Sequence, residues 1–186
     1  LTVQGRLLPG EYRLPGNVSS QFFTGLLYAL PLLEGLSALI PTTPLESEDY
    51  IHMTLQAMGQ FGVEMPTALS LPPQYHPQGN QTYAPGQAAV EPDWSQAGFW
   101  FAAKALGNPV EVVGMKLPSV QGDQRYLEME EKLYAGAGAE LDVSQNPDLV
   151  PPLAAAAALA AGRTTRLIKA ERLRLKESDR LRSVTA

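Results

Sequence analysis

The sequence has 186 residues, of which 45% are hydrophobic and 18% charged, enough for one domain or two small ones with a buried core. It contains no cysteine, which excludes disulfides, thiolate metal sites and a cysteine nucleophile and suits a cytoplasmic location, and its two histidines, His52 and His76, lack the spacing of a zinc site. Residues 163–182 hold eight basic and three acidic side chains in an otherwise acidic chain, which favours a small anionic ligand over nucleic acid.

Helices are predicted wherever a polar capping residue precedes apolar residues at helical spacing. The first follows Ser19 and Ser20, and its apolar face repeats from Phe22 to Leu30. Five more are predicted in chain order: after Ser47 to about Phe61, Trp94–Leu106 after Asp93, Gln124 to about Ala135 after Asp123, Leu149–Ala161 after Asp148, and from about Ser178 onward. The alanine-rich run from Leu149 is too short to span a bilayer, so we expect no membrane segment.

Short β-like runs alternate with these helices. The predicted strands are Glu11–Leu14, Ala38–Pro41, Gly62–Met65, Ala88–Glu91, Val110–Val113, Glu140–Val143 and Thr164–Lys169. This order predicts a mixed α/β (α+β) fold. Residues 66–88 contain five prolines and little apolar content, so we predict a domain boundary near residue 88. A long hairpin within one domain is the alternative.

Three hydroxyl-bearing positions lie at predicted helix starts in the first half of the chain. Ser19, Ser20 and Gln21 begin one helix, where free backbone N–H groups favour an anion, and the nearby Gly16 would allow close backbone approach. Ser47 begins the next helix, with Tyr50 one turn further along. For both starts the alternative is that the serine only caps its helix.

Acidic and basic residues gather at two helix starts in the second half. Asp148 precedes an alanine-rich helix whose small side chains allow close packing, so its carboxylate is either a simple cap or a group that, near a lysine, accepts a proton from a hydroxyl. The segment Lys176–Arg180 carries two cations, two carboxylates and a hydroxyl. Such charges often pair with one another in solvent, but a positive excess at a helix N-terminus is unfavourable unless an anion is present.

Six short motifs, in this order along the chain, are similar to those of the 3-phosphoshikimate 1-carboxyvinyltransferase (EPSP synthase) family. They are Asn17-Val18-Ser19-Ser20-Gln21-Phe22, Leu45-Glu46-Ser47-Glu48-Asp49-Tyr50-Ile51, Asp93-Trp94-Ser95-Gln96-Ala97, Gln121-Gly122-Asp123, Asn146-Pro147-Asp148-Leu149 and Lys176-Glu177-Ser178-Asp179-Arg180-Leu181. The resemblance implies βαβαββ units arranged in two domains, with the substrates between them. It predicts that residues 1–88 are the end of the first domain, on the shikimate-3-phosphate side, and residues 89–186 the start of the second.

The resemblance also implies a reaction and a role for each site residue. The enolpyruvyl group of phosphoenolpyruvate is transferred to the 5-hydroxyl of shikimate 3-phosphate and phosphate is released, in aromatic amino-acid biosynthesis. Asp148 is implied as the proton acceptor from the 5-hydroxyl and Glu177 as the acid and base at the methylene carbon. The implied substrate-binding residues are Ser19, Ser20, Gln21, Ser47, Tyr50, Lys176 and Arg180.

The implied chemistry requires no cofactor and no metal. The expected partners are the two substrates, with neither nucleic acid nor a membrane, and we expect a cytoplasmic protein that is a monomer when full length. Arginine forks, lysine and helix N-termini are the groups that best hold two phosphates and two carboxylates.

The sequence also departs from the family pattern. N-terminal and C-terminal segments with further substrate-binding cations are absent, the interval from Gly138 to Asp148 is short, and Arg172 stands where the family often has asparagine or an acidic residue. We therefore expect these 186 residues alone to be inactive. Three alternatives stay open: a non-catalytic remnant of the same enzyme, the sister transferase that acts on UDP-N-acetylglucosamine, and a nucleic-acid-binding module using the basic residues between 163 and 182.

Overall fold

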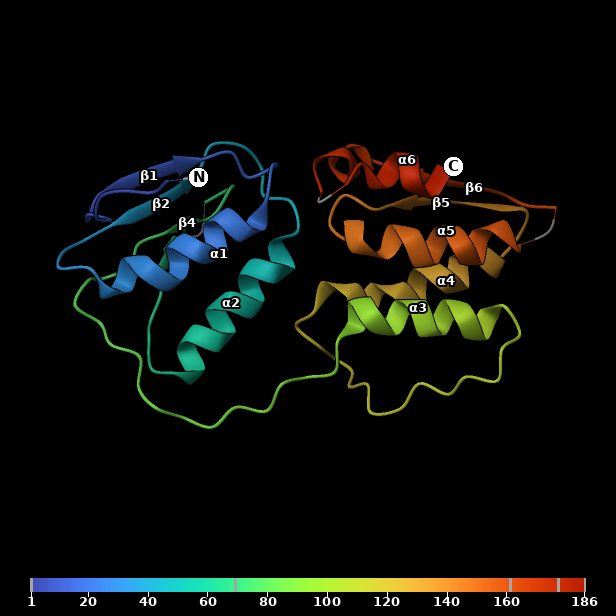
Figure 1. Ribbon diagram of the computed structural model, residues 1–186, viewed down its shortest axis with the longest axis horizontal. Helices are drawn as coiled ribbons and strands as arrows, with labels where there is room; N and C mark the ends of the chain where they lie inside the picture. The colour runs from blue at the N-terminus through green and yellow to red at the C-terminus, as the bar shows by residue number, and fades with distance from the viewer. Residues whose placement is uncertain (1, 69, 161, 177, 186) are drawn as a thin grey trace. The chain divides into compact units, whose positions relative to one another are not determined.

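The structure, a computed structural model, describes residues 2–68, 70–160, 162–176 and 178–185 (Figure 1). The chain divides into two compact units, Leu1–Ala89 and Val90–Ala186. Within the described ranges, no helix is long and apolar enough to cross a membrane. The assignment of the two units to the two domains of the EPSP synthase family stays a prediction.

The first unit runs in the order β α β α β β. Its elements are β1 (Glu11–Leu14), α1 (Ser20–Ala29) with the short 3-10 turn Leu30–Leu32, β2 (Ala38–Pro41), α2 (Glu48–Gln60), β3 (Thr67–Ala68) and β4 (Gln74–Tyr75). The sheet order is β1-β2-β4-β3, with β1 and β2 parallel and the other pairs antiparallel. The mixed α/β fold class is thereby confirmed, and this unit has the βαβαββ order that the resemblance implies.

Helices α1 and α2 lie together on one face of this sheet (Figure 1). Their apolar residues recur at helical spacing, so Phe23 and Leu27 of α1 and Ile51 of α2 point into one core with Leu39 of β2, each 0% exposed. Complete burial of such side chains stabilises a fold by about 1.5–3 kcal/mol each. The amphipathic pattern therefore fixes which faces of the two helices meet the sheet.

The proline-rich segment 66–88 belongs to the first unit and contributes a buried residue to its core. It contains β3 and β4, and Tyr75 of β4 is 1% exposed. Burial, with a smaller contribution from the Glu48 carboxylate, raises the pKa of Tyr75 to about 12. The predicted strand Gly62–Met65 was wrong, because the left-handed φ of +79° at Gly62 turns the chain at the end of α2 and the strand pairing begins only after Pro66.

The second unit is mostly helical. Its helices are α3 (Trp94–Ala105), α4 (Tyr126–Tyr134), α5 (Val150–Ala158) and α6 (Arg180–Thr185), its 3-10 turns are η2 (Gly122–Arg125), η3 (Pro147–Leu149) and η4 (Glu171–Leu175), and its strands are β5 (Gly138–Asp142) and β6 (Thr164–Ile168). The two strands pair in parallel with Gly138 opposite Thr164, and α5 forms the crossover between them. Helix α5 lies between this strand pair and helices α3 and α4 (Figure 1).

Aromatic and aliphatic side chains fill the core of the second unit. Trp94, Phe101 and Tyr126 stack in sequence, with ring centroids 6.1 and 5.9 Å apart. Leu153 of α5 is 0% exposed in the same core. Gly98 lets α3 approach closely, because a Cβ there would lie 3.2 Å from the Tyr126 ring. Residues at the N-terminal ends of α3, α5 and α6 line the same cavity.

Several elements at the start of this unit and within it differ from prediction. The strand predicted over Glu140–Val143 spans Gly138–Asp142, and the one predicted over Thr164–Lys169 ends at Ile168. The predicted strands Ala88–Glu91 and Val110–Val113 lie in irregular backbone. The helix predicted after Asp123 begins as the 3-10 turn η2, and the helix predicted from Leu149 is regular only over Val150–Ala158. In each case the sequence pattern does not encode the contacts that the element needs. A strand needs a neighbouring strand, and a helix start needs hydrogen-bond acceptors for its first N–H groups.

Candidate functional site

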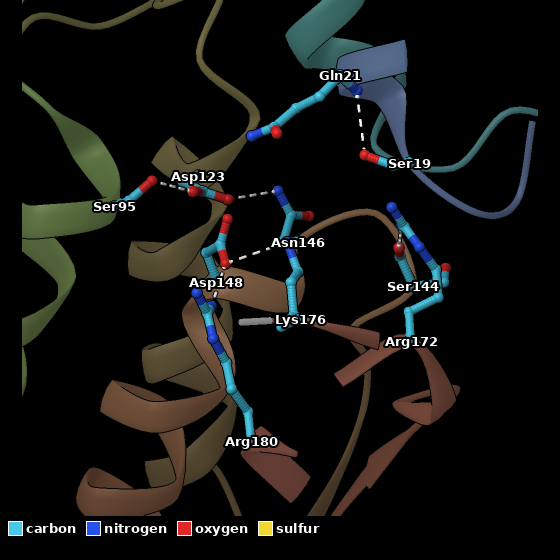
Figure 2. Close-up of polar contacts among 10 residues, drawn as sticks. All are labelled: Ser19, Gln21, Ser95, Asp123, Ser144, Asn146, Asp148, Arg172, Lys176 and Arg180. Carbon is cyan, nitrogen blue, oxygen red and sulfur yellow. Dashed lines mark hydrogen bonds and ion pairs between the residues drawn. The ribbon is translucent and has the colours of Figure 1, made fainter. Parts of the chain in front are cut away.

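The N-terminus of α1 carries three of the predicted site residues. Ser19 is the N-cap in extended conformation, and its Oγ accepts a hydrogen bond of 3.3 Å from the backbone N–H of Gln21 (Figure 2). Ser20 is 5% exposed, whereas the Gln21 side chain is exposed. The capping interpretation of Ser19 is confirmed. A substrate contact by these three residues stays a prediction.

Gly16 does make the expected close backbone approach, and its neighbour is the loop of Thr43 and Pro44. A Cβ at Gly16 would lie 2.7 Å from the Thr43 carbonyl oxygen and 2.8 Å from that of Pro44. The Gly16 N–H also donates to Thr43 Oγ1 at 2.9 Å, and its carbonyl accepts from Glu46 N–H at 3.1 Å. Gly16 therefore holds the loop before Ser19 against the loop before Ser47, which couples two predicted substrate-binding segments.

We expect Gly16→Ala to destabilise the first unit by about 1–3 kcal/mol. The added methyl group would clash with two backbone carbonyl oxygens, which cannot move away as the end of a flexible side chain can. Gly25→Ala in α1 is the matched control. Nothing lies within 4 Å of a Cβ there, and alanine favours a helix by about 0.5–1 kcal/mol over glycine. Urea unfolding of both variants measures this. Equal stability of Gly16→Ala and the parent chain would contradict the packing role.

Ser47 occupies the N-cap position of α2 without acting as a side-chain cap. Its backbone is left-handed, with φ 56° and ψ 45°, its side chain makes no capping hydrogen bond, and the residue is 2% exposed. Its carbonyl accepts the N–H of Tyr50 at 3.2 Å. The predicted side-chain cap was wrong, because a serine oxygen reaches the first helical N–H groups only from extended backbone. Left-handed conformation in a residue with a Cβ costs about 1–2 kcal/mol, and such positions gather at functional sites.

Asp148 lies at the centre of a charged cluster in the second unit (Figure 2). Arg180 Nη1 donates to Asp148 Oδ1, and Lys176 Nζ lies 3.4 Å from the same oxygen. The three side chains are 24–27% exposed, so water reaches them but does not surround them. Asp148 comes from η3, Lys176 from the turn after η4, and Arg180 from the first residue of α6. Glu177 lies outside the described residues.

Two expectations about this cluster need correction. Asp148 is not a helix cap, because the chain makes the turn η3 first and Asp148 lies inside it. The positive excess at the start of α6 is also partly neutralised by the protein itself. Asp148 pairs with Arg180 and Lys176. Asp179 accepts the Arg182 N–H at 3.0 Å and lies 3.5 Å from Arg174, so Asp179 caps α6, which begins at Arg180.

A cavity of about 530 Å³ opens beside the charged cluster, and its lining belongs entirely to the second unit. Its lining residues are Ser95, Gln96, Phe99, Asp148, Pro151, Arg180, Ser183 and Val184. Polar groups therefore occur together with an aromatic ring and a proline. An arginine fork at the wall of a cavity suits a carboxylate or phosphate ligand, because its planar donors match two anionic oxygens.

A buried carboxylate lies next to the cavity residue Ser95, and the sequence assigned it a helix cap and a place in one family motif but no role in the site. Asp123 is 3% exposed, and it accepts hydrogen bonds from Ser95 Oγ and, at 2.9 Å, from Asn146 Nδ2 (Figure 2). All three residues occur in the motifs of the family resemblance, which was the only sequence signal that set them apart. Arg172, which departs from the family pattern, donates to the Ser144 carbonyl at 3.2 Å.

Asp142, the last residue of β5, forms an exposed ion pair with Lys169, which follows β6. Lys169 Nζ donates to Asp142 Oδ2 at 2.6 Å, and this bond, with that from Ser144 N–H, holds the pKa of Asp142 at about 2, below its usual 3.8. Among the described residues, no group of three or more His, Asp or Glu side chains has a metal-binding arrangement.

We expect the Asp142 ion pair to contribute less than about 1 kcal/mol to stability at pH 7, because its side chain is 43% exposed and solvent screens the pair. A depressed pKa stabilises the fold above the unfolded-state value, so this contribution is lost between about pH 4 and pH 2. Unfolding free energies of the parent and Asp142→Asn at pH 7 and pH 2 measure it. A difference that persists at pH 2 would contradict this origin.

Comparison with known proteins decides the family. The model of the family EPSP synthase (3-phosphoshikimate 1-carboxyvinyltransferase) matches residues 1–186. The chain belongs to this family. Its curated relatives named 3-phosphoshikimate 1-carboxyvinyltransferase include that of Clostridium kluyveri, 44% identical over 201 residues, that of Clostridium perfringens (strain 13), 40% over 200, and that of Clostridioides difficile, 40% over 199.

The chain spans about half the length of the curated relatives it matches. These alignments cover 99–100% of this EPSP synthase family chain but only 45–46% of the relatives. The alignment with the Clostridium kluyveri protein extends over 201 positions, more than the 186 residues present, so that relative contains residues inside the aligned region that this chain lacks. That the difference falls between Gly138 and Asp148 stays a prediction.

Proposed function

We propose that this chain serves the transfer of the enolpyruvyl group of phosphoenolpyruvate to the 5-hydroxyl of shikimate 3-phosphate, with release of phosphate, in cytoplasmic aromatic amino-acid biosynthesis. The observation that carries the proposal is the Asp148 carboxylate paired with Arg180 and Lys176 at the wall of a cavity. Membership of the EPSP synthase family supports it. Because the chain matches less than half of each relative, the proposal concerns a protein that holds the remaining substrate-binding groups as well.

The proposed chemistry assigns one proton transfer to each carboxylate. Asp148 accepts the proton of the 5-hydroxyl as that oxygen bonds to the central carbon of phosphoenolpyruvate, and Glu177 protonates the methylene carbon. The resulting tetrahedral intermediate then expels phosphate, and loss of a methyl proton to Glu177 restores the double bond. Arg180 holds phosphoenolpyruvate and Lys176 holds shikimate 3-phosphate. The remaining contacts to shikimate 3-phosphate belong to Ser19, Ser20, Gln21, Ser47 and Tyr50.

The geometry of the second unit supports this division of roles. A carboxylate that pairs with cations is ionised, and the ionised form is the one that accepts a proton. Two cations on one carboxylate leave a net positive charge, which suits an anionic ligand. Positioning two substrates together contributes roughly 7–11 kcal/mol toward such a barrier, so a reaction of this kind proceeds without a metal or organic cofactor.

The test is phosphate release by a chimera in which this chain replaces the matching region of the Clostridium kluyveri relative. We expect release that requires both phosphoenolpyruvate and shikimate 3-phosphate and that is absent when UDP-N-acetylglucosamine replaces the latter. The 186-residue chain alone is expected to release none. A chimera that is folded, by circular dichroism and cooperative unfolding, yet releases no phosphate with both substrates would contradict the proposal.

A further inference from the structure

We propose that Asp123 is a positioning residue that sets the orientation of Asp148 through Asn146. The inference rests on the proposed function, because it gives Asp123 a role in presenting the proton acceptor. Asp123 contributes no atom to the cavity lining, and the motif that contains it predicted only a helix cap. Its role is inferred from its burial and from the two elements that it joins.

Asp123 fixes the Asn146 side chain. Asn146 is 1% exposed, and its Nδ2 donates to Asp123 Oδ1 at 2.9 Å. A carboxylate only accepts, so it also determines which end of the amide faces it. Among the described residues the Asn146 Oδ1 atom has no hydrogen-bond partner, so the bond to Asp123 is what orients the Asn146 side chain.

Asn146 then fixes the turn that carries Asp148. The Asn146 N–H donates to the Val143 carbonyl at 3.2 Å, and the Asn146 carbonyl accepts the Leu149 N–H at 3.1 Å. Asp148 lies inside the turn closed by that second bond. The Asn146 backbone is thus part of the turn that carries Asp148. We therefore expect a change in the Asn146 side chain to shift the backbone that positions the Asp148 carboxylate.

Asp123 also binds a second residue, and this one lines the cavity. Ser95 of α3 lines the cavity and donates its hydroxyl proton to Asp123 Oδ2 (Figure 2). Asp123 thus ties α3 to the turn of Asp148 through two hydrogen bonds to one carboxylate. Because a buried carboxylate needs donors for its oxygens, both Ser95 and the turn of Asp148 are held by the same group.

The test is carried out on the 186-residue chain by NMR at constant pH, with the Asp148 side-chain carboxyl carbon and the Arg180 Nε–Hε group as reporters. We expect Asp123→Asn to shift both signals. Tyr126→Phe is the matched control: it removes another hydrogen bond to a carboxylate in the same unit, from Tyr126 to Glu130, and is expected to leave both signals in place. Methyl signals of Leu141 and Leu153 report whether each variant keeps its core.

A double-mutant cycle separates positioning from the simple loss of a negative charge. In an Asn146→Ala background the charge effect of Asp123→Asn remains, whereas the positioning effect has already been removed. We expect the shift caused by Asp123→Asn to fall by at least about half in that background. Equal shifts in both backgrounds, or none in either, would overturn the inference. If Asp123→Asn does not fold, Asn146→Ala alone decides: unchanged reporter signals would overturn the inference.

In the chimera the same change has a distinct kinetic consequence. We expect Asp123→Asn to lower kcat about 10- to 100-fold while the KM for phosphoenolpyruvate changes less than about twofold, because a misplaced proton acceptor affects the reacting geometry more than substrate binding. A raised KM with unchanged kcat would contradict the positioning role. The NMR result does not depend on turnover, so its failure is distinguishable from failure of the proposed function.

Discussion

Replacing Asp148 by asparagine is expected to lower kcat of the chimera by about 10²- to 10⁴-fold, the range over which a positioned proton acceptor contributes to a rate. Asparagine keeps the size of the side chain but does not accept a proton. Binding of shikimate 3-phosphate is expected to change much less than kcat. The measurement is steady-state phosphate release with each substrate varied in turn.

Asp142→Asn is the control for this prediction. It also replaces a carboxylate that is ion-paired with a lysine, on the strand leading to the same turn, but its side chain lies outside the cavity. We expect its kcat to stay within about twofold of the parent, as for a surface ion pair. An Asp148→Asn chimera with parental kcat would remove Asp148 from the proposed mechanism.

Replacing Arg180 by alanine is expected to raise the KM for phosphoenolpyruvate by about 30-fold or more, since loss of one partner of a partly desolvated charge pair costs about 2–5 kcal/mol. Arg180→Lys keeps the charge but not the planar fork, so we expect an intermediate KM. The shikimate-3-phosphate KM is expected to change less. Initial rates at varied concentrations of each substrate measure both values.

Arg182→Ala provides the matched control, because Arg182 is exposed on the same helix and does not line the cavity. Its KM values are expected to stay near those of the parent. If Arg180→Ala and Arg182→Ala raised the KM for phosphoenolpyruvate equally, the overall positive charge of α6 rather than a specific contact would explain binding.

Much of the first unit was predictable from local pattern. The bounds of β1 and β2 follow from short apolar runs bounded by turn residues, and α1 and α2 follow from apolar residues at helical spacing. A hairpin over residues 66–88 was given only as an alternative, and its strands β3 and β4 were not predicted. Each strand is two residues long, and β4 also pairs with β2, which is distant in the sequence. The αL backbone of Ser47 was also missed, because it depends on the loop packed around Gly16 rather than on the capping motif.

The charged site in the second unit was predictable in part. The motif resemblance singled out Asp148, Lys176 and Arg180, and the structure brings these three side chains together. It did not predict that Asp148 lies within a 3-10 turn or that Asp123 supports it from behind. The turn is a local deviation from the helical pattern, closed by the bond between Asn146 and Leu149. The contact of Asp123 with Asn146 joins residues more than twenty positions apart, which local periodicity does not report.

Residue-resolved NMR of the 186-residue chain, titrated with each substrate, tests the proposed substrate site directly. We predict that phosphoenolpyruvate shifts the side-chain signals of Arg180 and Asp148 saturably, and that shikimate 3-phosphate shifts Lys176 and the amides of Ser19, Ser20 and Ser47. Inorganic sulfate at matched ionic strength serves as the control for charge alone. Saturating substrates that leave these signals unchanged, or that move them no more than sulfate does, would contradict the proposed substrate site.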